Sequence, residues 1–190
     1  MLVDTKHLTY ERYLAMPEMK CRYEIIDGEL IMAASPIPLH QWIVGNVYRV
    51  VHAFVSLHRL GIVLMAPLDI LIRRDPLRTR QPDLLFLSAA RSGITEGAQL
   101  RGLQLLQQVP DLVIEILSPT NTRRDLDQKL EDYRSIGVRE CWIVSPEALT
   151  VEVMRLSAEG VHPLDIFGTG MTVRSQVLEG LAVPVAEIFA

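Results

Sequence analysis

The sequence predicts an α/β (α+β) fold, in which a mixed β-sheet is flanked by helices and preceded by an N-terminal β-hairpin. Short apolar segments with strand character alternate with helical segments, a turn dipeptide separates two apolar runs near the N-terminus, and a strand–helix–strand passage occupies the middle. A chain of 190 residues can build one substantial core and is short for two. We therefore expect a single domain over residues 1–190.

The composition narrows the class of protein. The chain is 49% hydrophobic and 22% charged, as is ordinary for a globular protein, and its net charge of −4 gives no overall positive field for nucleic acid or an anionic membrane. Its two cysteines are far apart, which argues against a disulfide scaffold or a structural zinc site. No apolar run reaches the ~18 residues of a membrane span. We expect a cytoplasmic protein with no membrane partner.

The N-terminal part predicts a helix and a hairpin. Residues 8–16 have the pattern of a short helix with Thr9 as a plausible N-cap. Residues 22–33 contain two apolar runs around Asp27-Gly28, the strongest short signal for a hairpin.

A long helix and three strands are expected next. Over residues 35–61 apolar side chains recur at helical spacing, and Gly61 can end the helix. Strands follow near 62–72, where Pro67 breaks the pattern, and at 83–87.

The centre of the chain predicts a crossover connection. A polar segment with glycine, residues 88–109, is the best candidate for a flexible loop. Residues 112–117 form a strand, a helix runs from about 121 to 136, and residues 140–145 form the next strand with a hairpin partner at 149–156.

The C-terminal part predicts smaller elements. The "GTG" at 168–170 reads as a turn inside a hairpin, and residues 178–190 as a strand or turn followed by a short docking helix.

Six arginines fall into two groups along the chain. They are exposed side chains of a loop and a helix end, or else phosphate contacts beside an active site. These residues are Arg73, Arg74, Arg78, Arg80, Arg123 and Arg124.

Two carboxylates interrupt apolar strands. Glu115 lies inside "LVIEIL", and Asp83 begins "DLLFL". A buried carboxylate is costly unless it is paired, protonated or bound to a cation. If the two strands are neighbours, both acids converge on one point, where a hard cation such as Mg²⁺ is held and the backbone carbonyl of Ile116 adds a ligand.

Helical geometry brings Lys129 to the same place. At about 100° per residue, Leu126, Leu130 and Tyr133 define the buried face, and Lys129 lies about 60° from Leu126, on the edge of that face. Its ammonium can therefore reach back to the strand end of Glu115. Two acids and a lysine suit metal-assisted hydrolysis of a phosphodiester. The alternative is a structural Glu115–Lys129 ion pair, with Asp83 an ordinary residue at a strand start.

Several segments carry a resemblance to a known family. These are "YEIIDGELIMAASPIPLHQWIVGNV", "RQPDLLFL", "LVIEILSPTNTRRDLDQKLEDYRSIGVRECWIVSP" and "LEGLAVPVAEIF". Over about residues 8–190 the chain resembles the Uma family of restriction endonucleases, formerly a domain of unknown function, within the PD-(D/E)XK superfamily. The resemblance implies a restriction-endonuclease-like core and Mg²⁺-dependent nuclease activity, with Mn²⁺ able to substitute.

The resemblance also implies roles for individual residues. Asp83 and Glu115 correspond to the metal-binding acids, and Lys129 to the lysine that this family carries on the following helix. The superfamily's plain motif has this lysine two residues after the acid, where the chain has Leu117. A second departure is Ser145, where the family often has Asp.

Three further residues belong to an outer set. Glu24 resembles the family's early acid and binds metal directly or through water, or else is a surface glutamate of the hairpin. His40 resembles the family's histidine, or else is a core residue. Arg80 meets a substrate phosphate or pairs with an acid.

Asp125 lies outside this set and is expected to be a partner of the helix N-terminus and not a ligand.

Two functions from different classes follow. The first is a Mg²⁺-dependent endonuclease that cleaves DNA and acts as a homodimer. The second is a non-catalytic module that keeps the fold and binds nucleic acid or protein, which the acidic composition and the displaced lysine favour. A nuclease for RNA or branched DNA is a third option.

Overall fold

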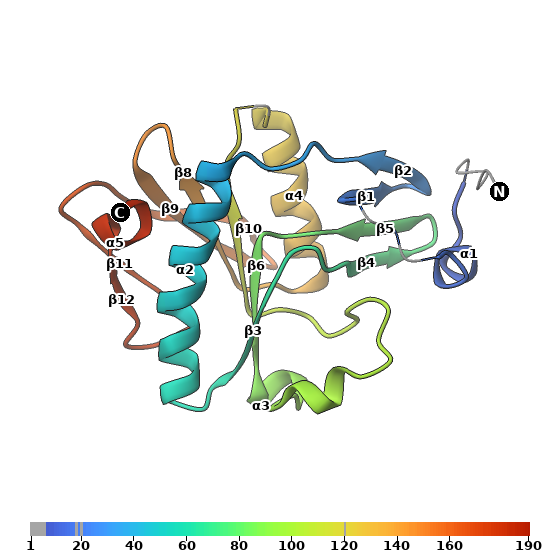
Figure 1. Cartoon of the computed structure of the whole chain (residues 1–190), viewed down its shortest axis with the longest axis horizontal. Helices are drawn as coiled ribbons and strands as arrows, with labels where there is room; N and C mark the ends of the chain where they lie inside the picture. The colour runs from blue at the N-terminus through green and yellow to red at the C-terminus, as the bar shows by residue number, and fades with distance from the viewer. Residues whose placement is uncertain (1–6, 18, 20, 120) are drawn as a thin grey trace.

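A computed structural model describes residues 7–17, 19, 21–119 and 121–190. These residues form a mixed α/β structure with a six-stranded sheet, a four-stranded sheet and a two-stranded ribbon (Figure 1). The α/β class, the mixed sheet and the N-terminal hairpin are confirmed. No helix in the described part of the chain is long and apolar enough to cross a membrane.

The elements follow one another in this order: α1 (Tyr10–Leu14), β1 (Tyr23–Ile26), β2 (Glu29–Met32), α2 (Pro38–Leu57), β3 (Gly61–Met65), β4 (Ile70–Arg74), β5 (Leu77–Arg80), β6 (Leu84–Ser88), α3 (Ala89–Ser92), the 3-10 helix η1 (Gly97–Leu100), β7 (Leu112–Ile116), α4 (Arg123–Ile136), β8 (Glu140–Ser145), β9 (Thr150–Ser157), β10 (Gly160–Phe167), β11 (Thr172–Arg174), β12 (Ala182–Pro184) and α5 (Val185–Phe189).

The six-stranded sheet is the centre of the molecule, with strand order β10-β9-β8-β7-β6-β3. Among its described strands, β7 and β8 pair in parallel, and the other neighbours pair antiparallel. Helix α4 connects the parallel pair, as the strand–helix–strand passage predicts. The hairpin partner of β8 is also confirmed, since β9 pairs antiparallel with it.

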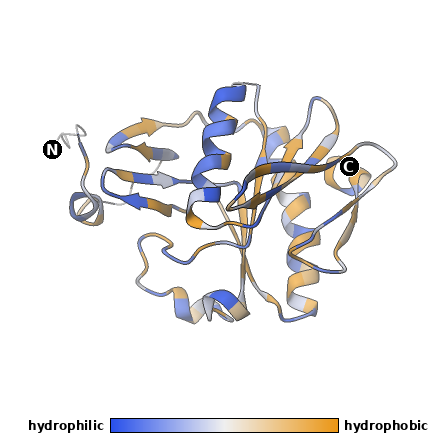
Figure 2. Cartoon of the chain, turned by 180° about the vertical axis from the view of Figure 1, so that it is seen from behind, coloured by the Kyte–Doolittle hydropathy of each residue, from blue (hydrophilic) through white to orange (hydrophobic). Residues whose placement is uncertain are grey.

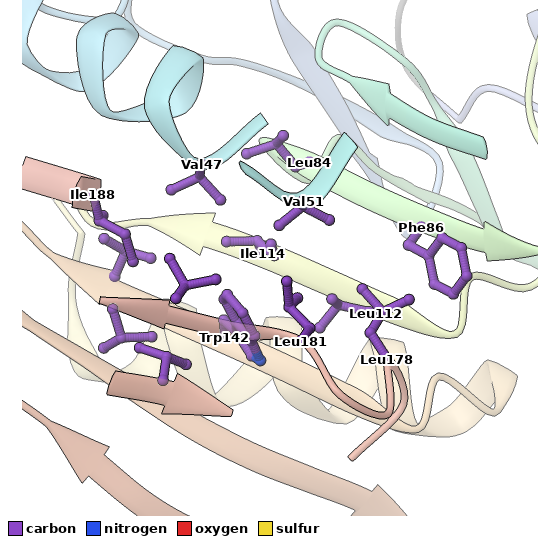
Figure 3. Packing of buried hydrophobic residues seen from close by; sticks show 14 of the residues in the cluster. Val47, Val51, Leu84, Phe86, Leu112, Ile114, Trp142, Leu178, Leu181 and Ile188 are labelled. Atoms are coloured by element: carbon purple, nitrogen blue, oxygen red, sulfur yellow. The ribbon is translucent and has the colours of Figure 1, made fainter. Parts of the chain in front are cut away.

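Each face of this sheet is covered by a different layer. Helix α2, the β11–β12 ribbon and α5 cover one face, and α4 covers the other together with the segment 88–109. In Figure 3, Val47 and Val51 of α2 point toward Ile114 of β7, and Trp142 of β8 lies in the same apolar layer. Figure 2 shows hydrophobic colour along the central strands and hydrophilic colour over the outer side of α4.

The long helix is confirmed, with one correction at its end. Pro38 occupies its first turn, and its buried positions recur every three or four residues. The helix ends at Leu57, and Gly61 does not cap it but begins β3. A Cβ at Gly61 would lie 2.0 Å from the carbonyl oxygen of Leu87, so this glycine permits β3 and β6 to approach closely.

Helix α4 has its predicted limits because both ends are capped locally. The Thr122 side chain accepts a hydrogen bond from the backbone N–H of Asp125, and the Asp125 carboxylate accepts one from the backbone N–H of Thr122. Asp125 is thus the predicted partner of the helix N-terminus. Gly137, with φ of 90°, closes the C-terminal end in the left-handed conformation. Thr9 likewise caps α1.

The segment 88–109, predicted to be a flexible loop, is mostly irregular but is packed against the rest of the molecule. The segment contains α3 and η1, and Leu105 and Leu106 are buried. Leu106 accepts a backbone hydrogen bond from Leu71 at 2.9 Å and donates one to Asp69 at 2.8 Å. The apolar residues of the segment 88–109 show neither a helical nor a strand period. The burial of Leu106 depends on its contacts beside β4, about 35 residues earlier in the chain.

One strand was not predicted, and one expected hairpin is absent from the described residues. The apolar stretch broken at Pro67 supplies β3 and β4 to different sheets, and β4 pairs with a strand that the sequence did not predict, β5. The "GTG" turn at 168–170 joins β10 to β11, which belong to different sheets and do not pair, so the expected hairpin around it is wrong. The short C-terminal strand and helix are confirmed as β12 and α5.

Candidate active site

The two acids of the apolar strands lie side by side. Strands β6 and β7 are antiparallel neighbours, and Leu84 pairs with Ile114, so continuing the register places Asp83 beside Glu115. The carboxylate Oδ2 of Asp83 accepts a hydrogen bond of 2.8 Å from the backbone N–H of Ile116. Asp83 is 2% exposed and Glu115 4%. The sheet therefore brings two buried carboxylates to one point.

Lys129 reaches this point from α4, as its helical position predicts. Its Nζ lies 2.8 Å from Glu115 Oε2 and 3.7 Å from Glu24 Oε1. Tyr133, one turn further along α4, donates its hydroxyl to Glu115 Oε1. Burial raises the pKa of Glu115, and the neighbouring charge of Asp83 raises it further, against the opposing effect of Lys129.

Asp83 has a different set of partners. Arg22 Nη1 lies 2.8 Å from Oδ1, and His40 Nε2 lies 3.3 Å from Oδ2. Burial alone would raise the pKa of Asp83, but the contacts with His40, Arg22 and the Ile116 N–H outweigh it and lower this pKa. The two neighbouring carboxyls are therefore shifted in opposite directions, as in many acid–base sites.

Arg22 was missed by sequence reasoning, although a signal exists. It stands two residues before Glu24 at the start of the hairpin, and alternate residues of an extended strand share a face. Arg22 is also anchored by a 2.6 Å hydrogen bond from Nη2 to the carbonyl of Gln81.

The four-stranded sheet supplies the outer part of the site. Glu24 is not a surface residue of the hairpin, because its side chain is 17% exposed and its Oε2 lies 2.6 Å from Arg80 Nη1. Arg80 also donates from Nε to Asp132 on α4 at 2.7 Å, and Arg78 donates to the same oxygen at 2.8 Å. Arg80 thus pairs with acids, as one of its two expected roles requires.

The arginine-rich stretch is not a solvated loop. Arg78 and Arg80 are buried in β5, whereas Arg73 and Arg74 at the end of β4 are exposed. The second group lies at the start of α4, where Arg123 forms an exposed pair with Asp127 at 3.0 Å. The six arginines do not form one basic surface.

The donor atoms present suit a hard divalent cation. Within the described ranges no three His, Cys, Asp or Glu side chains lie close enough to surround one ion. Mg²⁺ typically uses one or two carboxylates and retains water. Asp83 Oδ1 is buried and accepts no well-directed hydrogen bond from the described residues, although Arg22 lies in ion-pair range. The carbonyl of Ile116 faces the same neighbouring strand as its N–H, on the side of Asp83. Asp83, Glu115 and this carbonyl therefore fit such an ion.

The fold places the protein in the restriction-endonuclease-like class. The chain belongs to the Uma2 family, since the family model described as "Putative restriction endonuclease" matches residues 10–186. Among solved structures it is similar to a "putative nuclease" belonging to DUF820 from Anabaena variabilis, at 20% identity and a TM-score of 0.77 over 96% of this chain and 97% of that one. At this identity the likeness concerns the fold alone. No curated protein matches the chain.

Proposed function

We propose that this protein is a Mg²⁺-dependent endonuclease that hydrolyses phosphodiester bonds of DNA, with Mn²⁺ able to replace Mg²⁺. The observation that carries the proposal is the convergence of Asp83, Glu115 and Lys129 at one end of β6 and β7. Membership of the family described as "Putative restriction endonuclease" supports the reaction class.

The metal ligands in this proposal are the carboxylates of Asp83 and Glu115 and the backbone carbonyl of Ile116, with Glu24 contributing directly or through water. These groups would hold a divalent cation, which when bound would supply polarisation of the phosphate and a lowered pKa for water. Asp83 is oriented for this role by its hydrogen bond from Ile116 N–H and by His40.

The remaining residues position groups and balance charge. Lys129 carries a positive charge on Nζ, 2.8 Å from Glu115, where it orients the attacking water and offsets charge developing on the phosphate. Arg80 holds Glu24 toward Lys129 through its 2.6 Å ion pair. Lys129 thus reaches the acids from α4. It supplies the positive charge that the superfamily motif places at the position of Leu117.

A plasmid-cleavage assay tests the proposal. Purified protein is incubated with supercoiled plasmid and Mn²⁺ or Mg²⁺, beside the Asp83→Ala/Glu115→Ala double variant. Nicking or linearisation is expected from the wild type and not from the variant. Cleavage that persists unchanged in the variant would rule out these residues as the metal ligands.

One observation favours the alternative of a non-catalytic module that binds nucleic acid or protein. Asp83, Glu115 and Glu24 are each already paired with a protein cation: Arg22, Lys129 and Arg80. Calorimetric titration with Mg²⁺, with and without DNA, separates the two functions. Binding of DNA without any binding of metal would support the module.

We further propose that the protein acts as a homodimer and as a single domain in the cytoplasm. Most apolar positions of α2 that suggested dimerisation lie in the chain's own core, but Leu39, Trp42 and Leu57 are exposed. Sedimentation velocity measures the oligomeric state directly.

The proposed compartment rests on the cysteines. Cys21 and Cys141 form no disulfide, which suits a reducing compartment.

A further inference from the structure

A cavity of about 730 Å³ opens beside the candidate active site. It lies where the parallel strands β7 and β8 end, between the first turns of α2 and α4. Ligands of α/β proteins commonly bind outside the carboxyl ends of parallel strands. Its volume falls in the range of small-molecule sites.

The cavity is continuous with the paired acids. Glu115 on β7 pairs with Ile143 on β8, and Ile143 pairs with Glu152 on β9, so these three side chains form a row across one face of the sheet. Ile143 and Glu152 line the cavity. Since neighbouring strands are about 4.8 Å apart, the cavity begins one strand away from Glu115.

His40 forms a second link between the two sites. It lines the cavity, and its Nε2 lies 3.3 Å from Asp83. The ring is 93% buried, as its side-chain exposure of 7% shows, and its Nδ1 has no hydrogen-bond partner within the described ranges. A buried ring nitrogen without a partner among the described residues calls for a hydrogen bond from a water or a ligand.

The lining combines apolar walls with hydrogen-bonding groups. Leu117, Leu126 and Ile143 supply apolar surface, and Thr150 and Glu152 supply polar groups. The carboxylate of Glu152 takes part in no hydrogen bond or ion pair with the described residues. A flat ligand with apolar faces and a polar edge suits this lining. Arg123 also lines the cavity, but it is paired with Asp127 at 3.0 Å. The free carboxylate of Glu152 can accept a hydrogen bond from an amino group.

We propose that this cavity binds an unpaired nucleobase, one with an exocyclic amino group, adjacent to the phosphodiester that is cleaved. The inference rests on the proposed nuclease function and names its substrate class. A base stacked and paired in a duplex cannot enter a cavity of this kind, so the nucleotide must already be unpaired or leave the helix. The substrates are therefore DNA strands with unpaired cytosine, adenine or guanine near the cut, in single strands, flaps or junctions, and thymine, which lacks an amino group, is disfavoured.

Binding without cleavage tests the inference. Fluorescence anisotropy is measured with labelled oligo-dC, oligo-dT and a blunt duplex of equal length, in Ca²⁺ to suppress cleavage. Wild-type protein is expected to bind oligo-dC at least about tenfold more tightly than the duplex, and more tightly than oligo-dT. Equal affinity for single strand and duplex would overturn the inference.

Two variants and one control locate the binding. Thr150→Phe fills the cavity and is expected to weaken oligo-dC binding about tenfold, whereas Thr172→Phe, the same change on β11 away from the cavity lining, is not. Glu152→Gln keeps the shape and is expected to reduce the preference for oligo-dC over oligo-dT, which tests the inference even if Thr150→Phe fails to fold. An unchanged preference in Glu152→Gln would contradict the role of its carboxylate.

The outcome is distinguishable from failure of the nuclease proposal. Selective oligo-dC binding that Thr150→Phe abolishes, in a protein that cleaves no DNA with any divalent metal, leaves the cavity inference standing without the nuclease. Undiminished cleavage of blunt duplex by a folded Thr150→Phe protein leaves the nuclease standing and overturns the cavity inference.

Discussion

Arg22 supplies positive charge to a buried carboxylate in the proposed metal site. Its guanidinium lies 2.8 Å from Asp83 Oδ1, and Asp83 is almost fully buried. Removing one partner of such a pair leaves an uncompensated charge. We therefore predict that Arg22→Ala lowers the free energy of unfolding in EDTA by about 3 kcal/mol, and that Mn²⁺ restores much of it. Thermal unfolding with and without Mn²⁺ measures both effects.

Arg139→Ala is the matched control for Arg22→Ala. Arg139 lies 2.6 Å from Asp111, another fully buried carboxylate, at the opposite end of β7. This variant is also expected to lose stability, but Mn²⁺ should restore none of it. Equal rescue of both variants would show that the ion stabilises the protein elsewhere.

Lys129 is predicted to serve the reaction and not to hold the ion. Lys129→Met keeps the length of the side chain and removes its charge from Glu115. Plasmid cleavage is expected to fall by about 10²- to 10³-fold, with Mn²⁺ affinity retained in calorimetry. Gln128→Met, an exposed neighbour on α4, should leave both measurements unchanged. Loss of Mn²⁺ binding in Lys129→Met would contradict this division of roles.

At the scale of elements, one aspartate ties the small sheet to the large one. Asp132 on α4 accepts hydrogen bonds from Arg78 at 2.8 Å and from Arg80 at 2.7 Å, and Arg80 in turn holds Glu24. Asp132→Ala removes one carboxylate from two buried guanidinium groups, of which Arg78 keeps Asp27 and Arg80 keeps Glu24. The loss of hydrogen bonds between charged groups is expected to cost about 1.5–3 kcal/mol.

The variant Asp132→Ala is therefore expected to raise hydrogen exchange throughout β1 and β5. Exchange in the central strands β7 and β8 should change much less, because their ladder is untouched. Glu131→Ala, which removes an exposed carboxylate one residue away, should change stability by less than about 0.5 kcal/mol. Uniform exchange across all strands would indicate that the small sheet does not loosen separately.

The sequence predicted those elements whose signals are local. The passage β7–α4–β8 was predicted almost to its limits, because apolar runs, the cap at Thr122 and the left-handed Gly137 all act within a few residues. Strand β5 was missed because "LRTR" looks like an exposed polar segment. Its arginines are buried in ion pairs with Asp132. Because Asp132 lies more than fifty residues further along the chain, no local signal predicts this pairing.

The same distinction applies to the candidate site. Asp83 and Glu115 were found because each interrupts an apolar strand, and Lys129 because helical geometry directs it toward them. Arg22 was missed because its partner Asp83 is remote in sequence. The roles of these residues remain predictions that the experiments above test.

At the scale of the whole molecule, Asp111 connects three strands at the end of the sheet opposite the candidate site. It accepts a hydrogen bond of 2.8 Å from the backbone N–H of Ser88, the last residue of β6, and lies 2.6 Å from Arg139, the residue before β8. Burial alone would raise the pKa of Asp111, but the contacts with Ser88 and then with Arg139 and Arg91 outweigh it and lower this pKa. Asp111 should therefore make the stability of the whole sheet depend on pH.

The sign of this dependence follows from linkage. A carboxyl whose pKa is lower in the folded than in the unfolded chain adds stability above the unfolded value, about 3.9, and loses it as pH falls through the folded value. Asp111→Asn cannot titrate, so it should be less stable than the wild type by about 1.5–3 kcal/mol at pH 7, and the difference should shrink below about pH 4. Because Arg139 is half exposed, most of the effect comes from the hydrogen bonds.

Urea unfolding from pH 3 to 7 measures the difference in stability between Asp111→Asn and the wild type, with the exposed Asp127→Asn as a control that should show a small difference. A difference for Asp111→Asn that stays constant over this range would show that its carboxyl does not link the strands through its charge.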